Sequence, residues 1–142
     1  MECKYLSTRK KERSITRKIV ATTKAPAAIG PYAQANIIDN LVFTSGQIPL
    51  NPETGQLVSG GIEAQTKQVF ANLSEVLKEA GSSLEDMVKT TCFLTDMNDF
   101  ATVNEIYAEY FPKGVFPSRS AIEISKLPKG AMIEIEAIAL IK

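Results

Sequence analysis

An arginine and two glutamates are the residues of this sequence best placed to do chemistry. Arg119 follows a proline in the strand-like segment Phe116–Glu123, and Glu134 and Glu136 alternate with isoleucines. An arginine is rarely buried without a partner, and its planar guanidinium binds a carboxylate through two parallel hydrogen bonds. The two glutamates are two residues apart in a predicted strand, so they point to the same face, roughly 7 Å apart. This pattern predicts a guanidinium that binds a carboxylate, and carboxylates set among apolar neighbours.

Both kinds of residue also have ordinary structural roles. An arginine such as Arg119 fits an ion pair inside the protein as well as it fits a ligand site. A glutamate such as Glu134 is more often the partner of a neighbouring lysine or arginine than a catalytic group. The residues alone leave these alternatives open.

The absence of histidine from all 142 residues removes several mechanisms. Zinc deaminases use histidine and cysteine ligands with a Pro-Cys-x-x-Cys element, which this sequence lacks. Serine–histidine and cysteine–histidine nucleophiles are excluded, and so is RNA cleavage by histidine acid–base catalysis. Any reaction must therefore use arginine, carboxylates, tyrosine, lysine, backbone groups and water.

Charge is unevenly spread along a chain whose formal net charge is zero. Residues 1–18 contain seven basic and two acidic residues, a net charge of +5, so the rest of the chain carries −5. An acidic body argues against a protein built mainly to bind nucleic acid. We predict a solvated, poorly ordered basic arm over residues 1–16 and one folded domain over residues 17–142.

Cysteine usage and hydropathy argue against a secreted or membrane protein. The two cysteines, Cys3 near the start and Cys92 in an apolar strand pattern, form no disulfide framework. No apolar run reaches the roughly 18 residues of a membrane span, and the N-terminus lacks the apolar region of a signal peptide. We therefore expect a cytoplasmic protein with no membrane partner. The basic N-terminus leaves an organellar transit peptide as a weaker alternative.

The periodicity of apolar residues predicts six strands and two helices. The predicted strands cover residues 17–22, 32–38, 41–45, 87–95, 117–125 and 131–141. The clearest helix covers residues 61–80, because it carries an apolar stripe of helical spacing and is followed by Gly81, a typical helix stop. A second helix is predicted over residues 99–111, with Asp96 or Asn98 as its cap.

The order of these elements, βββ-α-β-α-ββ, predicts an α+β fold with both helices on one face of a mixed sheet. Between the first helix and the fourth strand, Ser82–Glu85 resembles a capping box that opens a short turn. The other face of the sheet, which we expect to be rich in valine, isoleucine and alanine, would lie uncovered in a monomer. An exposed apolar face of this kind is an interaction surface.

Six segments of the chain, taken in order and with their spacing, resemble the RidA (YjgF) family of reactive-intermediate deaminases. These segments are Ala25–Tyr32, Thr44–Pro49, Val88–Thr91, Asn98–Asn104, Phe116–Ser120 and Ile133–Ala137. Each segment alone is a weak signal, but six in order are specific. The resemblance covers about Ile19 to Ile141, nearly everything except the N-terminal arm.

The resemblance implies a chorismate-mutase-like α+β fold, with a mixed six-stranded sheet and two helices on one face. It implies a homotrimer with sites at subunit interfaces. It also implies a 2-iminobutanoate/2-iminopropanoate deaminase, which hydrolyses enamine and imine products of pyridoxal-phosphate enzymes, such as 2-aminoacrylate, to 2-keto acids and ammonia. No metal or cofactor is required, because an imine carbon is already electrophilic.

By matching position, the resemblance implies that Arg119 grips the substrate carboxylate and that Glu134 holds the attacking water. The residues implied to line the pocket are Tyr32, Ser45, Gly46, Asn104 and Tyr107. Without the resemblance, Tyr32 would be assigned to a strand core, Gly46 to backbone freedom and the two helical residues to packing. The family often has a cysteine two residues after the arginine, where this chain has Ala121. That difference puts thiol contacts or redox regulation in doubt, but not the hydrolysis.

Two other interpretations of the sequence remain open. One is a non-catalytic, small-carboxylate-binding or regulatory trimer that uses the same arginine. The other is a translation inhibitor or ribonuclease, against which the absent histidine and the acidic body both count.

Overall fold

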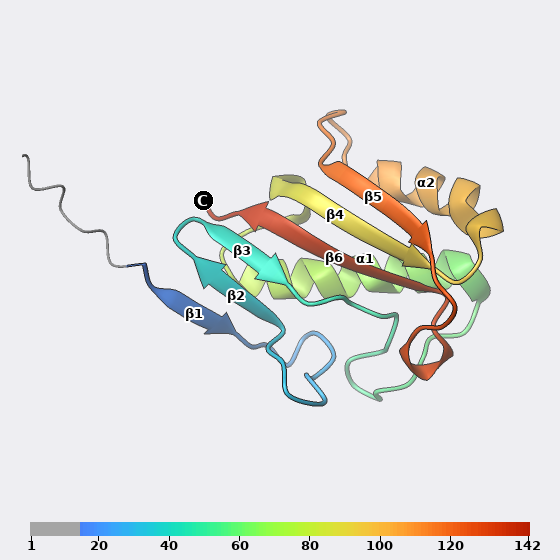
Figure 1. Cartoon of the computed structure of the whole chain (residues 1–142), viewed down its shortest axis with the longest axis horizontal. Helices are drawn as coiled ribbons and strands as arrows, with labels where there is room; N and C mark the ends of the chain where they lie inside the picture. Colours follow the sequence, from blue (N-terminus) through green and yellow to red (C-terminus); the bar gives the residue numbers. More distant parts are fainter. Residues whose placement is uncertain (1–14) are drawn as a thin grey trace, which may run out of the picture.

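A single mixed sheet of six strands, with both helices on one face, forms the fold of the protein (Figure 1). The structure, a computed structural model, describes residues 15–142. The strands are β1 (Arg17–Val20), β2 (Ala35–Ile38), β3 (Leu41–Thr44), β4 (Met87–Leu94), β5 (Ser118–Glu123) and β6 (Ile133–Leu140). The helices are α1 (Gly61–Glu79) and α2 (Phe100–Glu109). Three short 3-10 turns occupy Leu84–Asp86, Met97–Asp99 and Pro128–Gly130.

The strands lie in the order β1-β2-β3-β6-β4-β5. Every neighbouring pair is antiparallel except β4 and β5, which are parallel. Parallel strands need a crossover connection, and α2 supplies it between β4 and β5. The predicted α+β class, the element order and the mixed sheet are confirmed.

Strand β6 divides its side chains between the two faces of the sheet. Its alternate residues Ile133, Ile135, Ala137 and Ala139 are buried beneath the helices, on what we call the helix face. Glu134, Glu136, Ile138 and Leu140 point to the other side, which we call the open face. The prediction that both glutamates share one face is confirmed.

Helix α1 packs on the helix face through the predicted apolar stripe. Its buried residues include Val69, Leu73, Val76 and Leu77, all fully inaccessible to solvent. The helix ends where Gly81 adopts a φ of +85°, and the backbone N–H of Ser82 then donates to the carbonyl of Leu77 at 2.8 Å. The left-handed backbone at Gly81 explains the predicted stop, since only glycine adopts it without strain.

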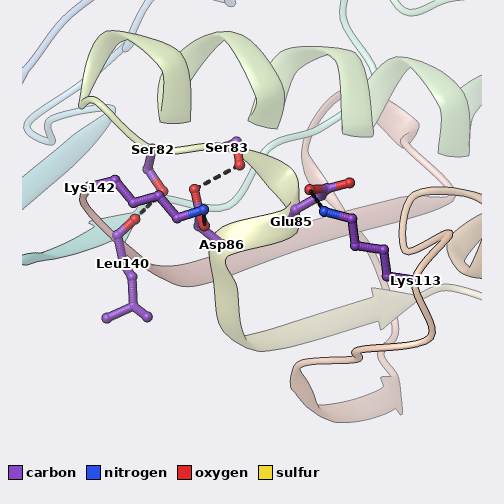
Figure 2. Close-up of polar contacts among 7 residues, drawn as sticks. All are labelled: Ser82, Ser83, Glu85, Asp86, Lys113, Leu140 and Lys142. Atoms are coloured by element: carbon purple, nitrogen blue, oxygen red, sulfur yellow. Dashed lines mark hydrogen bonds and ion pairs between the residues drawn. The ribbon is translucent and has the colours of Figure 1, made fainter.

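The predicted capping box at Ser82–Glu85 does not form. The turn starts one residue later, with Ser83 at the N-cap, and the Ser83 hydroxyl donates to Asp86 Oδ2 at 2.8 Å instead of capping a backbone N–H. Glu85 faces outward and pairs with Lys113 at 3.6 Å. Figure 2 shows both contacts side by side. The box fails because a single 3-10 turn places Asp86, not Glu85, three residues after the cap.

The same turn holds the C-terminal end of β6. The ammonium of Lys142 lies 2.8 Å from Asp86 Oδ1, and the Ser82 hydroxyl donates to the carbonyl of Leu140 at 2.6 Å (Figure 2). The end of the chain is thereby fastened to the segment that leads into β4.

The composition predicted for the open face is confirmed for isoleucine. The exposed apolar residues that the strand register places on this face also include leucine and phenylalanine, and they are Ile19, Ile38, Phe43, Ile122 and Leu140. Valine and alanine lie mostly on the helix face, as at Val42 and Ala139, where small side chains let α1 approach the sheet. The open face is nevertheless apolar and has no helix over it in residues 15–142.

Two further predictions concern the whole chain. Within the part that the structure describes, neither helix is long and apolar enough to cross a membrane. The basic arm predicted over residues 1–16 falls almost wholly outside the described residues.

Candidate active site

The seven residues predicted to form the site fall into two separate cavities of one chain. The first cavity, about 420 Å³, contains Tyr32, Ser45, Gly46 and Glu134. The second, about 410 Å³, contains Asn104, Tyr107 and Arg119. The structure therefore brings together four of the predicted residues and, elsewhere, the other three.

Glu134 is the carboxylate that lines the first cavity. It is half-buried on the open face of β6, and burial, together with the charge of Glu136, raises its pKa. No lysine or arginine of residues 15–142 forms an ion pair with it. Lys129 lines the same cavity, but its ammonium donates to the carbonyl of Gly55 at 3.3 Å. The interpretation of Glu134 as half of a structural pair has no support within residues 15–142.

Gly46 is required by the carboxylate of Glu134. A Cβ added to Gly46 would overlap Oε1 of Glu134 and lie 2.7 Å from its Cδ. Gly46 is not among the residues with positive φ, so backbone freedom does not explain it. The residue is a glycine because the glutamate approaches its backbone closely.

The segment around Gly46 is fastened to both the sheet and helix α1. Gln47 forms an antiparallel bridge with Ile135, with N···O distances of 2.9 and 3.2 Å. The buried side chain of Asn72, on α1, donates to the carbonyls of Ile48 and Leu50 at 3.1 and 3.0 Å. These contacts fix the position of the cavity wall opposite Glu134.

Tyr32 and Ser45 belong to the mouth of the first cavity. Strand β2 begins only at Ala35, so Tyr32 lies in the preceding loop and is 52% exposed, rather than being a strand core residue. The Ser45 hydroxyl donates to the carbonyl of Ala33 at 2.6 Å and keeps lone pairs free to accept. The buried amide of Gln34 donates to the carbonyls of Thr22 and Pro26, which closes the loop that carries Tyr32.

Arg119 dominates the second cavity, at the edge of the helix face. Its Nη1 donates to Asn104 Oδ1 at 2.7 Å, and its guanidinium carbon lies 4.7 Å from the ring centroid of Tyr107 and 5.2 Å from that of Phe100. No carboxylate of residues 15–142 forms an ion pair with it. The structural salt bridge considered for Arg119 is thus not formed within residues 15–142. The hydrogen bond to Asn104 leaves further N–H groups of the guanidinium with which it could bind a ligand.

Tyr107 takes part in the second cavity only through its ring. The residue is 4% exposed, and its hydroxyl lies 2.8 Å from the hydroxyl of buried Thr90. Burial raises the pKa of the Tyr107 phenol, although the hydrogen bond with Thr90 opposes that effect. The expectation that Tyr107 lines the pocket is met by its ring, while its hydroxyl points into the core. Phe116, also in the lining, was not anticipated from the sequence.

The two cavities open on opposite faces of the sheet. Arg119 pairs directly with Thr90, whose side chain is on the helix face. Glu134 pairs directly with Phe93, on the open face. One chain therefore does not place Arg119 and Glu134 against the same small molecule.

The thiol nearest to Ala121 is not a substitute for the cysteine common in the resembled family. Cys92 is the cross-strand neighbour of Ala121 on the helix face. It is fully buried, and burial raises its pKa to about 11, although the charge of Arg119 opposes the shift. A thiol of this kind is unreactive at neutral pH.

Comparison with known proteins agrees with the fold and with the motifs. The family model described as Endoribonuclease L-PSP matches residues 22–141. The chain is 54% identical over 127 residues to the 2-iminobutanoate/2-iminopropanoate deaminase of Mus musculus, covering 89% of this chain and 93% of that protein. The protein of the same name from Homo sapiens is 52% identical over 127 residues, with 89% and 92% covered. A RutC family protein of Pyrococcus abyssi is 51% identical over 125 residues, with 88% and 98% covered.

Solved structures of related proteins have the same fold. The Rid protein family member YyfA from Yersinia pestis superimposes with a TM-score of 0.86 at 49% identity, covering 89% of this chain and all of that one (100%). E. coli TdcF, solved with bound serine, superimposes with a TM-score of 0.83 at 42% identity, covering 88% and 99%. Because the family model spans most of the chain and these relatives align over nearly all of it, the protein belongs to the Endoribonuclease L-PSP family, the RidA (YjgF) family that its sequence motifs resemble.

Proposed function

We propose that this protein is an enamine/imine deaminase that hydrolyses 2-imino acids such as 2-iminopropanoate to 2-keto acids and ammonia. The observation that carries the proposal concerns Glu134, a carboxylate with a raised pKa that forms no ion pair among residues 15–142 and lines a cavity where Gly46 leaves room for it. A general base works best when its pKa lies near the operating pH. The deaminases of mouse and man, more than half identical to this chain, support the same activity.

We propose further that the site is assembled between copies of the chain in a homotrimer. The Glu134 cavity of one copy would face the Arg119 cavity of its neighbour, which removes the difficulty that the two residues lie on opposite faces of one sheet. The exposed isoleucine, leucine and phenylalanine side chains of the open face give such an assembly an apolar surface to bury. The family resemblance implies the trimeric state, which remains part of this proposal.

In this arrangement Arg119 binds the substrate carboxylate. Asn104 occupies Nη1, which leaves Nε and Nη2 as two parallel donors of the kind that bind a carboxylate bidentately. The rings of Tyr107 and Phe100 beneath the guanidinium hold its plane. Holding the substrate in register with the water lowers the barrier by several kcal/mol.

Glu134 then handles the protons of the reaction. An enamine first tautomerises to the imine, whose carbon is electrophilic. Glu134 takes a proton from water as the water oxygen bonds to that carbon and the C=N electron pair moves to nitrogen. The protonated Glu134 returns the proton to nitrogen, which gives a carbinolamine. Glu134 then takes the proton of the carbinolamine hydroxyl and passes it to the nitrogen as the oxygen electron pair forms the C=O bond and the C–N bond breaks, so ammonia and the keto acid leave. A positioned general base contributes roughly 10²–10⁴-fold to such a step.

The test is the release of ammonia and keto acid from freshly generated 2-aminoacrylate or 2-iminobutanoate. Arg119→Lys keeps the charge but loses the fork, so activity is expected to fall about tenfold to a hundredfold, since a charged hydrogen bond contributes roughly 1.5–3 kcal/mol. The activity of Arg119→Ala is expected to be lower still. Arg17→Lys, on exposed β1, is the matched control and should keep wild-type rates. Wild-type rates from Arg119→Ala would remove the proposed site.

Two other outcomes would support the rival functions. Carboxylate binding with no release of ammonia would indicate a non-catalytic binding protein. Salt-dependent affinity for RNA would support a ribonuclease, the activity after which the Endoribonuclease L-PSP family is named. We also propose that residues 17–142 form the complete functional unit, so that deletion of residues 1–16 leaves deaminase activity within a few-fold of the full chain.

A further inference from the structure

Thr90 lies in the middle of β4, where nothing in the proposed reaction involves it. The residue is fully buried, so it cannot touch a substrate. It is nevertheless the direct cross-strand neighbour of Arg119 on the helix face. Its hydroxyl oxygen lies 2.8 Å from the hydroxyl oxygen of Tyr107, and the guanidinium of Arg119 stacks over the Tyr107 ring at 4.7 Å. Thr90, Tyr107 and Arg119 thus form a closed set of contacts.

The ring of Tyr107 is held from several sides. Phe70 meets it edge-on at a centroid distance of 5.6 Å, and Phe111 lies against it at 5.2 Å. Those contacts hold the ring by packing. The hydrogen bond with Thr90 is the contact that fixes the far end of the side chain, and with it the tilt of the face on which the guanidinium rests.

Packing alone does not require a hydroxyl at position 90. Valine has the same shape and would bring no polar group into the interior, where an unpartnered hydroxyl is costly. The neighbouring helix-face residues of β4, Cys92 and Leu94, are apolar and fully buried. The hydroxyl of Thr90 therefore has one structural consequence, which is its bond to Tyr107.

We infer that Thr90 is a positioning residue for Arg119, acting through the ring of Tyr107. The inference rests on the proposed function in that Arg119 is taken to bind the substrate carboxylate. Loss of the Thr90 hydroxyl lets the Tyr107 ring turn, and the free edge of the guanidinium then no longer points along the direction of an incoming carboxylate. A guanidinium that is misplaced in this way binds the substrate carboxylate more weakly.

The experiment compares Thr90→Val with Thr90→Ser. Steady-state kinetics with 2-iminobutanoate and calorimetric binding of 2-oxobutanoate, the expected product, give KM, kcat and Kd. Thr90→Val is expected to raise both KM and Kd about three- to tenfold, with kcat changed less than about twofold. Thr90→Ser, which restores a hydroxyl, should bring both constants back to within about twofold of wild type.

Two further variants separate positioning from stability. Thr66→Val is the matched control, because Thr66 is also fully buried but its hydroxyl donates to the carbonyl of Ile62 within α1. It can lower Tm but should leave KM and Kd unchanged. Tyr107→Phe removes the other hydroxyl of the pair, so it should reproduce the effect of Thr90→Val, and the double variant should be no worse than either alone. Tyr107→Phe also serves as the test if Thr90→Val does not fold.

The outcomes distinguish this inference from the proposed function. If the wild-type protein binds 2-oxobutanoate but hydrolyses no imine, the deaminase proposal fails, and the Kd comparison still decides the role of Thr90. Unchanged KM and Kd in Thr90→Val or in Tyr107→Phe would overturn the inference. So would a serine variant that behaves like the valine variant.

Discussion

Arg119 and Glu134 lie on opposite faces of one sheet, on strands separated by β4. The partner of Arg119 across β4 is Thr90, on the helix face, and that of Glu134 is Phe93, on the open face. Because residue pairs in register point the same way, no side-chain rotation brings the guanidinium and the carboxylate of one chain together. A site that uses both must draw them from two copies.

This relationship predicts complementation between inactive variants. Arg119→Ala and Glu134→Gln, each inactive alone, should regain activity when the chains are refolded together. In randomly mixed trimers about a quarter of the sites would combine an intact Arg119 from one copy with an intact Glu134 from its neighbour. The measurement is ammonia release after co-refolding, with each variant refolded alone as the control. No recovery would indicate a site within one chain.

Glu134→Gln should not lower thermal stability at neutral pH. Burial and the charge of Glu136 raise the pKa of Glu134 in the folded protein, so its ionised form disfavours folding above that pKa. The glutamine variant lacks this charge, and its Tm at pH 7 should equal or exceed that of wild type. The difference should disappear as the pH falls below the ordinary carboxyl value of about 4.5, where the wild-type side chain is protonated in both states. If the Tm of Glu134→Gln at pH 7 were lower than that of wild type, a positively charged group of a neighbouring copy would be inferred to stabilise the Glu134 carboxylate.

The same raised pKa predicts the acid side of the pH–rate profile. Glu134 must be ionised to take a proton from water, so kcat/KM should fall as the pH drops through its pKa, which lies above that of an ordinary glutamate. Glu136→Gln removes the like charge on the same face and should shift this limb to lower pH. Glu85→Gln, at the exposed pair with Lys113, is the control and should leave the limb unchanged.

Gly46→Ala should strongly lower activity while leaving the fold intact. The new Cβ would overlap the Glu134 carboxylate, which is the movable end of a side chain rather than backbone, so Glu134 would turn away at small cost to stability. We expect a fall in kcat of about a hundredfold, as for loss of a general base, with Tm near wild type. Gly55→Ala, where an added Cβ meets nothing within 4 Å but φ is +69°, is the control. It should lower Tm and keep kcat.

Local patterns were sufficient to predict that Glu134 and Glu136 share a face. The seven proposed site residues were predicted from the family resemblance, and no local pattern indicated that one chain divides them between two cavities. The alternation around Glu134 and Glu136 places both on one face, because strand periodicity is a local property. The opposite facing of Arg119 depends on how β5 registers against β4, which involves residues far apart in sequence. No local signal could supply that register.

Two other details depended on contacts that the sequence does not display. Gly46 looks like a glycine kept for backbone freedom, and only its distance to Glu134 gives the actual reason. The sequence predicts a strand that begins at Tyr32, but the observed strand begins at Ala35, because the buried amide of Gln34 ties the preceding chain into a loop. In both cases a contact distant in sequence overrode the local preference.

The contacts of Asp86 predict a pH-dependent contribution to stability (Figure 2). Burial alone would raise the pKa of Asp86, but hydrogen bonds from Lys142 and Ser83 and the charge of Lys142 lower it overall. Because the pKa of Asp86 is lower in the folded protein, its ionised carboxylate stabilises the fold at pH values above the pKa of an unfolded aspartate, about 3.9. This stabilisation is lost as the pH falls through the pKa of Asp86 in the folded protein. Asp86→Asn should lower Tm at pH 7 by about 2–5 °C, and the difference should shrink below pH 4. Glu85→Gln should change Tm much less, because both partners of that pair are well exposed.

The buried thiol of Cys92 gives the last prediction. Its pKa of about 11 leaves only about one part in a thousand ionised at pH 8, and the side chain is inaccessible as well. In a Cys3→Ser background, the native protein should therefore show no labelling by maleimide over an hour, and complete labelling in guanidinium.

Adding Ala121→Cys restores a thiol at the position where the family often has one, half-buried on edge strand β5 and two residues from Arg119. That thiol should react within minutes in the native protein, since partial exposure and the nearby guanidinium favour the thiolate. Rapid native labelling of Cys92 itself would show that β4 and β5 separate on that timescale, which would also release Arg119 from Thr90 and Tyr107.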